Sequence, residues 1–141
     1  MDQRLSIITL GVKDLSIATD FYVNKFGWIK SNHSTDGISF FQLNGLMLGL
    51  YPLSEFKNEI ENINLSESGR NRISLALLAR SEQDVDELFS GFKSKEIEIL
   101  KQPEKAFWGG YSGYISDPDD NLWEIAYNPF IELDDNGNLK A

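Results

Sequence analysis

The stretch Phe107-Trp-Gly-Gly-Tyr-Ser-Gly-Tyr-Ile-Ser-Asp-Pro-Asp-Asp-Asn-Leu-Trp-Glu-Ile-Ala-Tyr-Asn-Pro129 predicts a glycine-rich aromatic loop followed by a β-hairpin. The turn is residues 117–121, where a proline with its φ already set is followed by residues that tolerate left-handed backbone. The flanking segments 114–116 and 122–127 are rich in β-branched and aromatic residues, as strands are. Pro129 ends the second strand, because proline cannot donate to a ladder.

Side chains alternate between the two faces of that second strand. Trp123, Ile125 and Tyr127 share one face and are predicted core, whereas Glu124 points the other way. The strand pattern alone favours a solvated Glu124. The paired glycines and aromatic rings of residues 108–113 favour the alternative, a carboxylate in a small-molecule cavity.

The whole chain reads as strand–helix–strand–strand–strand, repeated once. In the first half the pattern predicts strands at 5–12, 28–34, 38–43 and 46–51, with a helix that opens at Asp14 or Ser16 and ends at Gly27. In the second half it predicts strands at 72–78 and 96–100, a helix capped by Ser81 between them, a loop at 103–105, and then the hairpin. Residues 53–71 between the halves are predicted to be a connector with a short helix.

Composition excludes several classes of function. The 141 residues include no cysteine, which rules out disulfides, thiolate zinc sites and a cysteine nucleophile. The formal net charge of -9 opposes binding to nucleic acid. No segment is apolar enough to span a bilayer and the first residues do not resemble a signal peptide, so no membrane partner and a cytoplasmic location are expected.

Two separated motifs resemble one protein family. They are V-K-D-L-x-x-A-x-x-F-Y-x-x-x-F-G-W, residues 12–28, and W-G-G-Y-S-G-Y-x-x-D-P-D-x-N-L-W-E, residues 108–124. Both resemble the glyoxalase, bleomycin-resistance and extradiol-dioxygenase superfamily, the vicinal oxygen chelate fold. The resemblance implies an α+β fold in which two tandem βαβββ modules form a curled, partly closed mixed sheet around a cavity, with helices outside. Module one would span about residues 4–52 and module two about 72–130 of a single domain, with a polar tail at 131–141.

The resemblance also implies a metal site, and this chain departs from it. Metal-dependent members place His, Glu or Gln at four inward strand positions, which fall here on Ile7, Gly49, Arg72 and Glu124. Only Glu124 can ligate, and a transition metal needs three or more protein donors. His33, the single histidine, is expected in a solvated loop. We therefore expect no bound zinc, nickel or iron.

Three roles for Glu124 stay open: an ion pair with Arg72, a free general base, or a residue with no catalytic role. The residues expected to bind a ligand are Thr9, Phe41, Met47, Tyr51, Arg72, Ser74, Trp108, Tyr111 and Glu124. Three functions follow, in order of preference. They are a metal-independent protein that binds a small aromatic or weakly cationic molecule, a lyase- or isomerase-type enzyme that uses Glu124 as base, and an interaction module without a ligand. A homodimer is expected on the resemblance alone.

Overall fold

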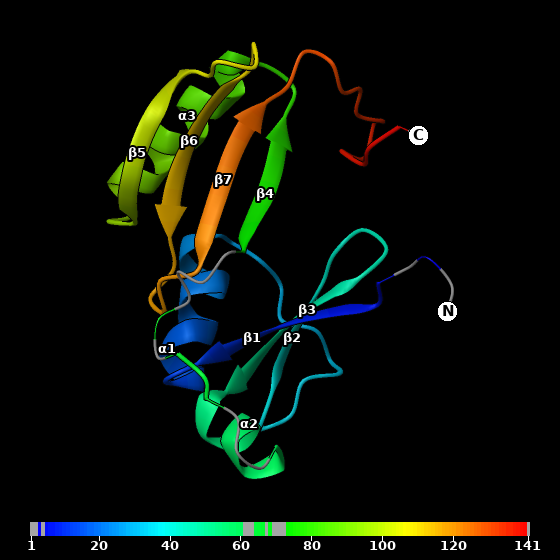
Figure 1. The fold of residues 1–141 in the computed structure, drawn as a ribbon, viewed down its shortest axis with the longest axis vertical. Coiled ribbons are helices and arrows are strands. Elements are labelled where there is room, and N and C mark those ends of the chain that lie inside the picture. Colours follow the sequence, from blue (N-terminus) through cyan, green and yellow to red (C-terminus); the bar gives the residue numbers. More distant parts are fainter. Residues whose placement is uncertain (1–2, 4, 61–63, 67, 69–72, 141) are drawn as a thin grey trace. The chain divides into compact units, whose positions relative to one another are not determined.

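The computed structural model describes residues 3, 5–60, 64–66, 68 and 73–140. The chain divides into two compact units, residues 1–71 and 72–141, and each is described by itself (Figure 1). The predicted α+β class is confirmed. The strands form a separate sheet in each unit, one of three strands and one of four, and not one continuous sheet. Within the described ranges, no helix has the length and hydropathy needed to cross a bilayer.

The first unit has a three-stranded sheet with a helix on one face. Its elements are β1 (Ile7–Val12), α1 (Leu15–Asp20), the π-helical turn η1 (Phe21–Lys25), β2 (Ser39–Gln42), β3 (Met47–Pro52) and α2 (Leu53–Glu59). Strand β3 lies in the centre, parallel to β1 and antiparallel to β2. The predicted strand at 28–34 is wrong, because this segment makes only an isolated bridge between Lys30 and Phe41.

Helix α1 starts and packs as the sequence predicts. The Asp14 side chain accepts a hydrogen bond from Ile17 N at 2.9 Å and so caps the helix. Tyr22, fully buried, packs against Phe41 and Trp28, with ring centroids 5.6 Å from each. These contacts make one face of the sheet the core of this unit.

The second unit contains the complete five-element pattern. Its elements are β4 (Ser74–Ala79), α3 (Glu82–Ser94), β5 (Glu98–Lys105), β6 (Tyr111–Ser116) and β7 (Leu122–Tyr127). The strand order is β4-β7-β6-β5, with β4 parallel to β7 and the other pairs antiparallel. The hairpin predicted around the 117–121 turn is therefore confirmed as β6 and β7.

The predicted loop at 103–105 is wrong, because β5 continues through Pro103 to Lys105. Its pairing with β6 slips twice, once between Ile99 and Lys101 and again between Lys101 and Glu104. Pro103 lies inside the second irregularity, where a missing N–H breaks no regular ladder bond.

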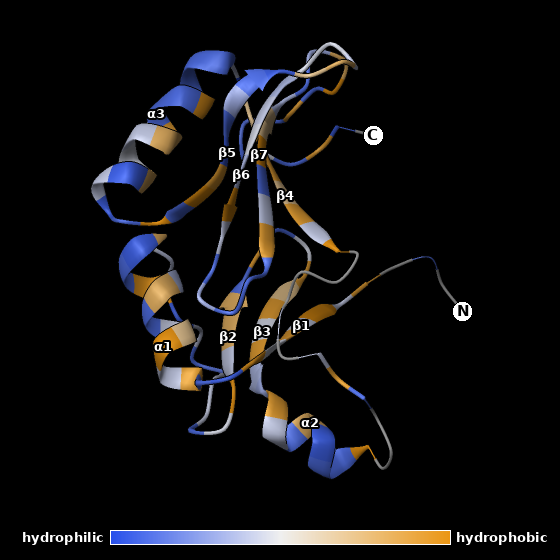
Figure 2. Ribbon diagram, turned by 60° about the vertical axis from the view of Figure 1, so that its left-hand side comes forward, coloured by the Kyte–Doolittle hydropathy of each residue, from blue (hydrophilic) through white to orange (hydrophobic). Residues whose placement is uncertain are grey.

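Helix α3 covers one face of the four-stranded sheet and leaves the other open. The Ser81 hydroxyl caps the helix by accepting from Asp84 N at 3.1 Å, as predicted. Phe89 packs toward Gly113, and in Figure 2 the hydrophobic residues of α3 lie on its sheet side. Trp123 and Ile125 are buried on this helix-covered face, as expected. The alternation of β7 then places Glu124 on the opposite side, which we call the open face.

Candidate functional site

Glu124 lies on the open face between two cross-strand neighbours. Its register partners are Tyr114 on β6 and Ala76 on β4. Burial, together with the negative charge of the nearby Glu124 carboxylate, raises the pKa of Tyr114. On the Ala76 side only a methyl group adjoins the glutamate. Glu124 is thus a half-buried carboxylate, with a phenol opposite it on one strand and a methyl group opposite it on the other.

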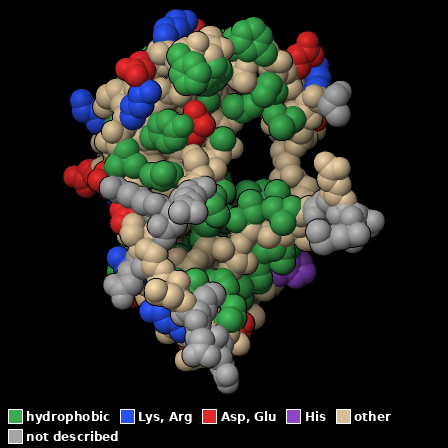
Figure 3. Space-filling model, viewed as in Figure 1, with side chains coloured by type: hydrophobic (Ala, Val, Ile, Leu, Met, Phe, Trp, Pro, Cys, Tyr) green, Lys and Arg blue, Asp and Glu red, His purple; other side chains and the backbone are tan. Residues whose placement is uncertain are grey.

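The surroundings of Glu124 change from polar to apolar across the sheet. The strand registers put these residues on the open face: Glu98, Lys101 and Glu104 of β5, Ser112, Tyr114 and Ser116 of β6, Leu122, Glu124 and Ala126 of β7, and Ser74, Ala76 and Leu78 of β4. Figure 3 looks onto this face and shows an acidic side chain among hydrophobic ones. Such a surface can hold a molecule that has an apolar body and a group able to contact the carboxylate.

Two predicted residues from the aromatic loop lie in different places. The Trp108 indole occupies the space that a side chain on Gly110 would need. Gly110 comes directly before β6, so the indole packs at the start of that strand. The Tyr111 hydroxyl instead donates to Asp86 Oδ1 of α3 at 2.8 Å, on the helix-covered face. The structure therefore does not bring Tyr111 together with Glu124.

The predicted residues of the first unit also divide between two faces. Thr9, Met47 and Tyr51 lie on the side of the sheet that α1 leaves uncovered, by their registers with Gly49 and its neighbours. Phe41 is 1% exposed and packs on the α1 side. The residue opposite Gly49 is Phe40, whose Cε1 would lie 3.1 Å from a Cβ at that glycine.

Tyr51 holds helix α2 against the sheet. Its ring meets the Phe56 ring edge-on at 5.0 Å between centroids, and its hydroxyl donates to Glu59. That hydrogen bond, with the negative charge of Glu59, raises the pKa of Tyr51 to about 12. The hydroxyl is therefore already engaged within the first unit.

Tyr114 is the main residue that the sequence-based prediction missed. The predicted partner of Glu124, Arg72, lies outside the described residues, so that pairing stays a prediction. Ser74 is exposed on the open face, opposite Leu122. The signal for Tyr114 was available, because a turn closed between residues 117 and 121 fixes 114 opposite 124.

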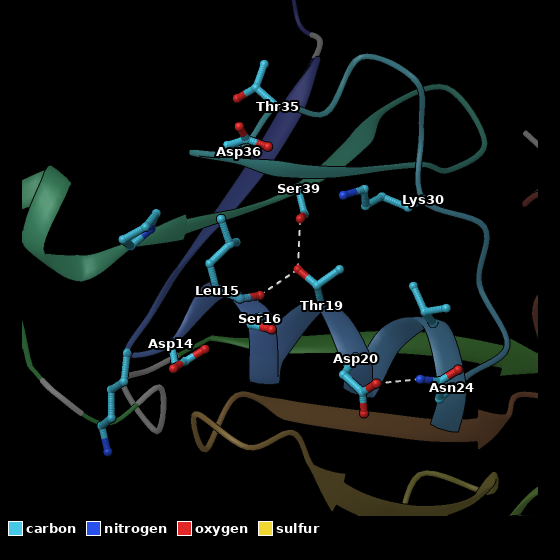
Figure 4. A pocket seen from close by; sticks show the side chains of 13 residues that line it. Asp14, Leu15, Ser16, Thr19, Asp20, Asn24, Lys30, Thr35, Asp36 and Ser39 are labelled. Atoms are coloured by element: carbon cyan, nitrogen blue, oxygen red, sulfur yellow. Dashed lines mark hydrogen bonds between the residues drawn. The ribbon is translucent and has the colours of Figure 1, made fainter.

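Apart from the open face of the second unit, the chain has a groove of about 840 Å³ beside α1 on the first unit (Figure 4). Thr19 Oγ1 donates to Leu15 O at 2.6 Å, so the Ser39 hydroxyl, 2.8 Å away, is the donor to Thr19. The groove is also lined by charges of both signs, Lys13, Lys30, Asp14, Asp20 and Asp36. Asp14 already caps α1, and this mixture favours no single class of ligand.

The comparison with protein families decides the relationship. The model of the glyoxalase/bleomycin resistance protein/dioxygenase superfamily matches residues 4–125. The chain belongs to this superfamily. A search of curated proteins gives no match.

Several solved structures resemble the chain along nearly its whole length. A glyoxalase-related enzyme from Fulvimarina pelagi is 28% identical with a TM-score of 0.87, over 99% of this chain and 98% of that one. The fosfomycin resistance protein FosX from Listeria monocytogenes is also 28% identical, with a TM-score of 0.68, over 92% of this chain and 97% of that one. A lactoylglutathione lyase from Agrobacterium tumefaciens, 24% identical with a TM-score of 0.70 over 90% of this chain and 95% of that one, shows the fold alone.

The residues on which the resemblance places the superfamily's metal positions do not fit a divalent ion. Ile7 offers an alkyl group and Gly49 only hydrogen, which leaves Glu124 as the one carboxylate among them. Within the described ranges, no three His, Cys, Asp or Glu side chains gather closely enough to hold a metal. One carboxylate falls short of the three or more donors that zinc or a similar ion takes from a protein.

Proposed function

We propose that this superfamily member binds a small organic molecule, aromatic and weakly cationic, on the open face around Glu124 without a divalent metal. The observation that carries the proposal is the Glu124 carboxylate itself, half-buried, opposite the Tyr114 phenol and beside small and apolar neighbours. A carboxylate in such surroundings attracts a cationic or proton-donating group more strongly than one in water does. The non-ligating Ile7 and Gly49 support the metal-independent part of the proposal.

Glu124→Gln tests this role, because it removes the charge and keeps the shape. We expect aromatic amines, found in a thermal-shift screen, to raise the melting temperature of the wild type by binding the native state. The variant should lose about tenfold in affinity, the order of one charge-assisted hydrogen bond. Calorimetric titration of wild type and variant with the same amine measures the loss.

Glu98→Gln is the matched control, because Glu98 lies on the same face but its carboxylate accepts from the Ser116 hydroxyl at 2.7 Å. Its affinity for the amine should equal that of the wild type. Equal binding of the amine by Glu124→Gln, or equal binding of the amine and its neutral alcohol analogue by the wild type, would contradict the proposal.

Protein purified without chelators is expected to contain far less than one equivalent of zinc, nickel, iron or manganese. The reason is the donor set, since only Glu124 among the superfamily's ligand positions can coordinate. Elemental analysis by mass spectrometry measures the content. A stoichiometric metal that Glu124→Ala removes would show that other donors complete the site.

Proton transfer is the second candidate function, and the position of the Tyr114 phenol opposite Glu124 favours it. The Glu124 carboxylate could take a proton from a bound carbon acid, and the Tyr114 hydroxyl opposite it could hold that acid in place. Turnover abolished by Glu124→Gln and reduced by Tyr114→Phe would support an enzyme over a binding protein. We also propose that the protein forms a homodimer, as the resemblance suggests. Light scattering, which measures the molar mass in solution, tests this.

A further inference from the structure

A separate hollow lies at the far end of the second unit, where the parallel strands β4 and β7 both finish. It has a volume of about 320 Å³, at the small end of the range for ligand pockets. Its walls come from the ends of these strands and from the segment that follows, and they comprise Ala79, Arg80, Tyr127, Asn128, Pro129, Ile131, Glu132, Leu133 and Lys140. The superfamily match ends at residue 125, so most of these residues lie beyond it.

The segment that closes this pocket has a defined fold. Leu133 and Leu139 form an antiparallel bridge around a turn. In that turn the Asp134 side chain accepts from Asn136 N at 2.9 Å and from Asn138 N at 2.8 Å. Arg80 Nη2 donates to Asp134 O at 2.6 Å and ties the turn to the end of β4. The guanidinium is therefore held in place, and its other N–H groups can donate to a ligand.

The pocket is rich in hydrogen-bond donors. Arg80 and Lys140 oppose one carboxylate, Glu132, which is 81% exposed and 3.5 Å from Lys140 Nζ. Asn128 Oδ1 accepts from Phe130 N at 2.9 Å, which orients the amide. In the described part of the chain the Tyr127 hydroxyl and the Asn128 NH2 group have no hydrogen-bond partner. A second carboxylate, that of Asp134, lies near, and hydrogen bonds from Asn138 together with the Arg80 charge lower the pKa of Asp134. Two cations and two carboxylates therefore surround the pocket, in a chain whose net charge is -9.

We propose that this pocket binds a small organic carboxylate, with its anionic group on Arg80 and its apolar body against the Tyr127 ring and the aliphatic side chains. A planar guanidinium can donate two parallel hydrogen bonds to a carboxylate. It also keeps its positive charge throughout the physiological pH range. A fully hydrated inorganic anion would gain nothing from the apolar side chains of Ala79, Ile131 and Leu133. The mixed lining therefore favours an acid that has a hydrophobic part.

The test is an NMR titration of the ¹⁵N-labelled full chain with three probes: benzoate, its neutral analogue benzamide, and inorganic phosphate. Benzoate is expected to cause saturable chemical-shift changes at the amides of residues 79–80 and 127–133. Benzamide and phosphate are expected to cause no saturable changes there. Arg80→Gln should weaken benzoate about tenfold. Because Arg80→Gln could also release the Asp134 turn, Lys140→Gln is the second variant, and it should weaken benzoate about threefold by loss of one nearby charge.

Lys105→Gln is the matched control, since Lys105 pairs with Glu82 on the helix-covered face, and it should bind benzoate as the wild type does. Equal shifts with benzamide, equal affinity for phosphate, shifts elsewhere in the chain, or wild-type affinity in both Arg80→Gln and Lys140→Gln would each overturn the proposal. The Glu124→Gln variant should keep benzoate binding, so the two proposed sites can fail independently.

Discussion

Asp117→Ala is expected to lower the free energy of unfolding by about 3 kcal/mol, because it leaves several buried donors without an acceptor. Asp117 is 3% exposed. Its Oδ1 accepts from Asp119 N at 3.0 Å and Asn121 N at 2.8 Å, and its Oδ2 accepts from Asn121 Nδ2 at 2.8 Å. These bonds shape the turn that sets β6 against β7, so urea denaturation should show the loss directly.

Asp134→Ala is the matched control for Asp117→Ala. Asp134 makes the same three bonds, to Asn136 N, Asn138 N and Asn138 Nδ2, but at a more exposed turn. Water can replace the lost acceptor there, so its loss of stability should be clearly smaller. Equal losses in the two variants would mean that burial of Asp117 does not decide the cost.

The parts of the fold that could be predicted correctly from the sequence are those set by interactions between residues close together in the chain. The 117–121 turn, the caps at Asp14 and Ser81, and the hairpin each depend on neighbouring residues alone, and all are present. The strand expected at 28–34 failed because pairing depends on a partner elsewhere, and only Lys30 finds one. Pro103 was misjudged for a related reason, since a proline signals a loop unless a bulge accommodates it.

The candidate site divides in the same way. Alternation along one strand correctly separated Glu124 from Trp123 and Ile125. Placing residues of different strands on one face needs the register as well. The chain closes the β2–β3 hairpin with a bond from Leu43 N to Leu46 O, which sets Phe40, and not Phe41, opposite Gly49. Counting back from each turn would have found both Phe40 and Tyr114.

The pocket beside Arg80 had no such signal in the sequence. Its donors come from residue 80, from 127–128 and from 140, and their proximity depends on how the segment after β7 folds back onto the end of β4. The Asp134 turn that makes this possible resembles the Asp117 turn in its hydrogen bonds, although its residues differ. Recognition of the repeated Asp-x-x-x-Asn spacing would have predicted the turn but not the pocket.

Gly113→Ala is expected to cost about 3 kcal/mol of stability, since it forces a methyl group into a full space between the sheet and α3. A Cβ at residue 113 would lie 2.5 Å from Phe89 Cζ, 2.8 Å from Lys101 O and 2.9 Å from Pro103 N. The Phe89 ring can turn aside, but the other two atoms are backbone at the irregularity of β5. The midpoint of urea denaturation should therefore fall, and the amide signals of β5 should shift most.

Gly91→Ala is the matched control, in which the same methyl group is added within helix α3. Apart from the backbone of its own helix and its two neighbours in the chain, no atom lies within 4 Å of a Cβ there, so alanine should stabilise the protein by about 1 kcal/mol through its higher helix propensity. The prediction would be contradicted if Gly113→Ala unfolded at the wild-type midpoint while Gly91→Ala showed its expected increase in stability. In that case β5 would have to move away from β6 at little cost in free energy. The irregular pairing around Pro103 would then be a flexible joint and not a fixed part of the sheet.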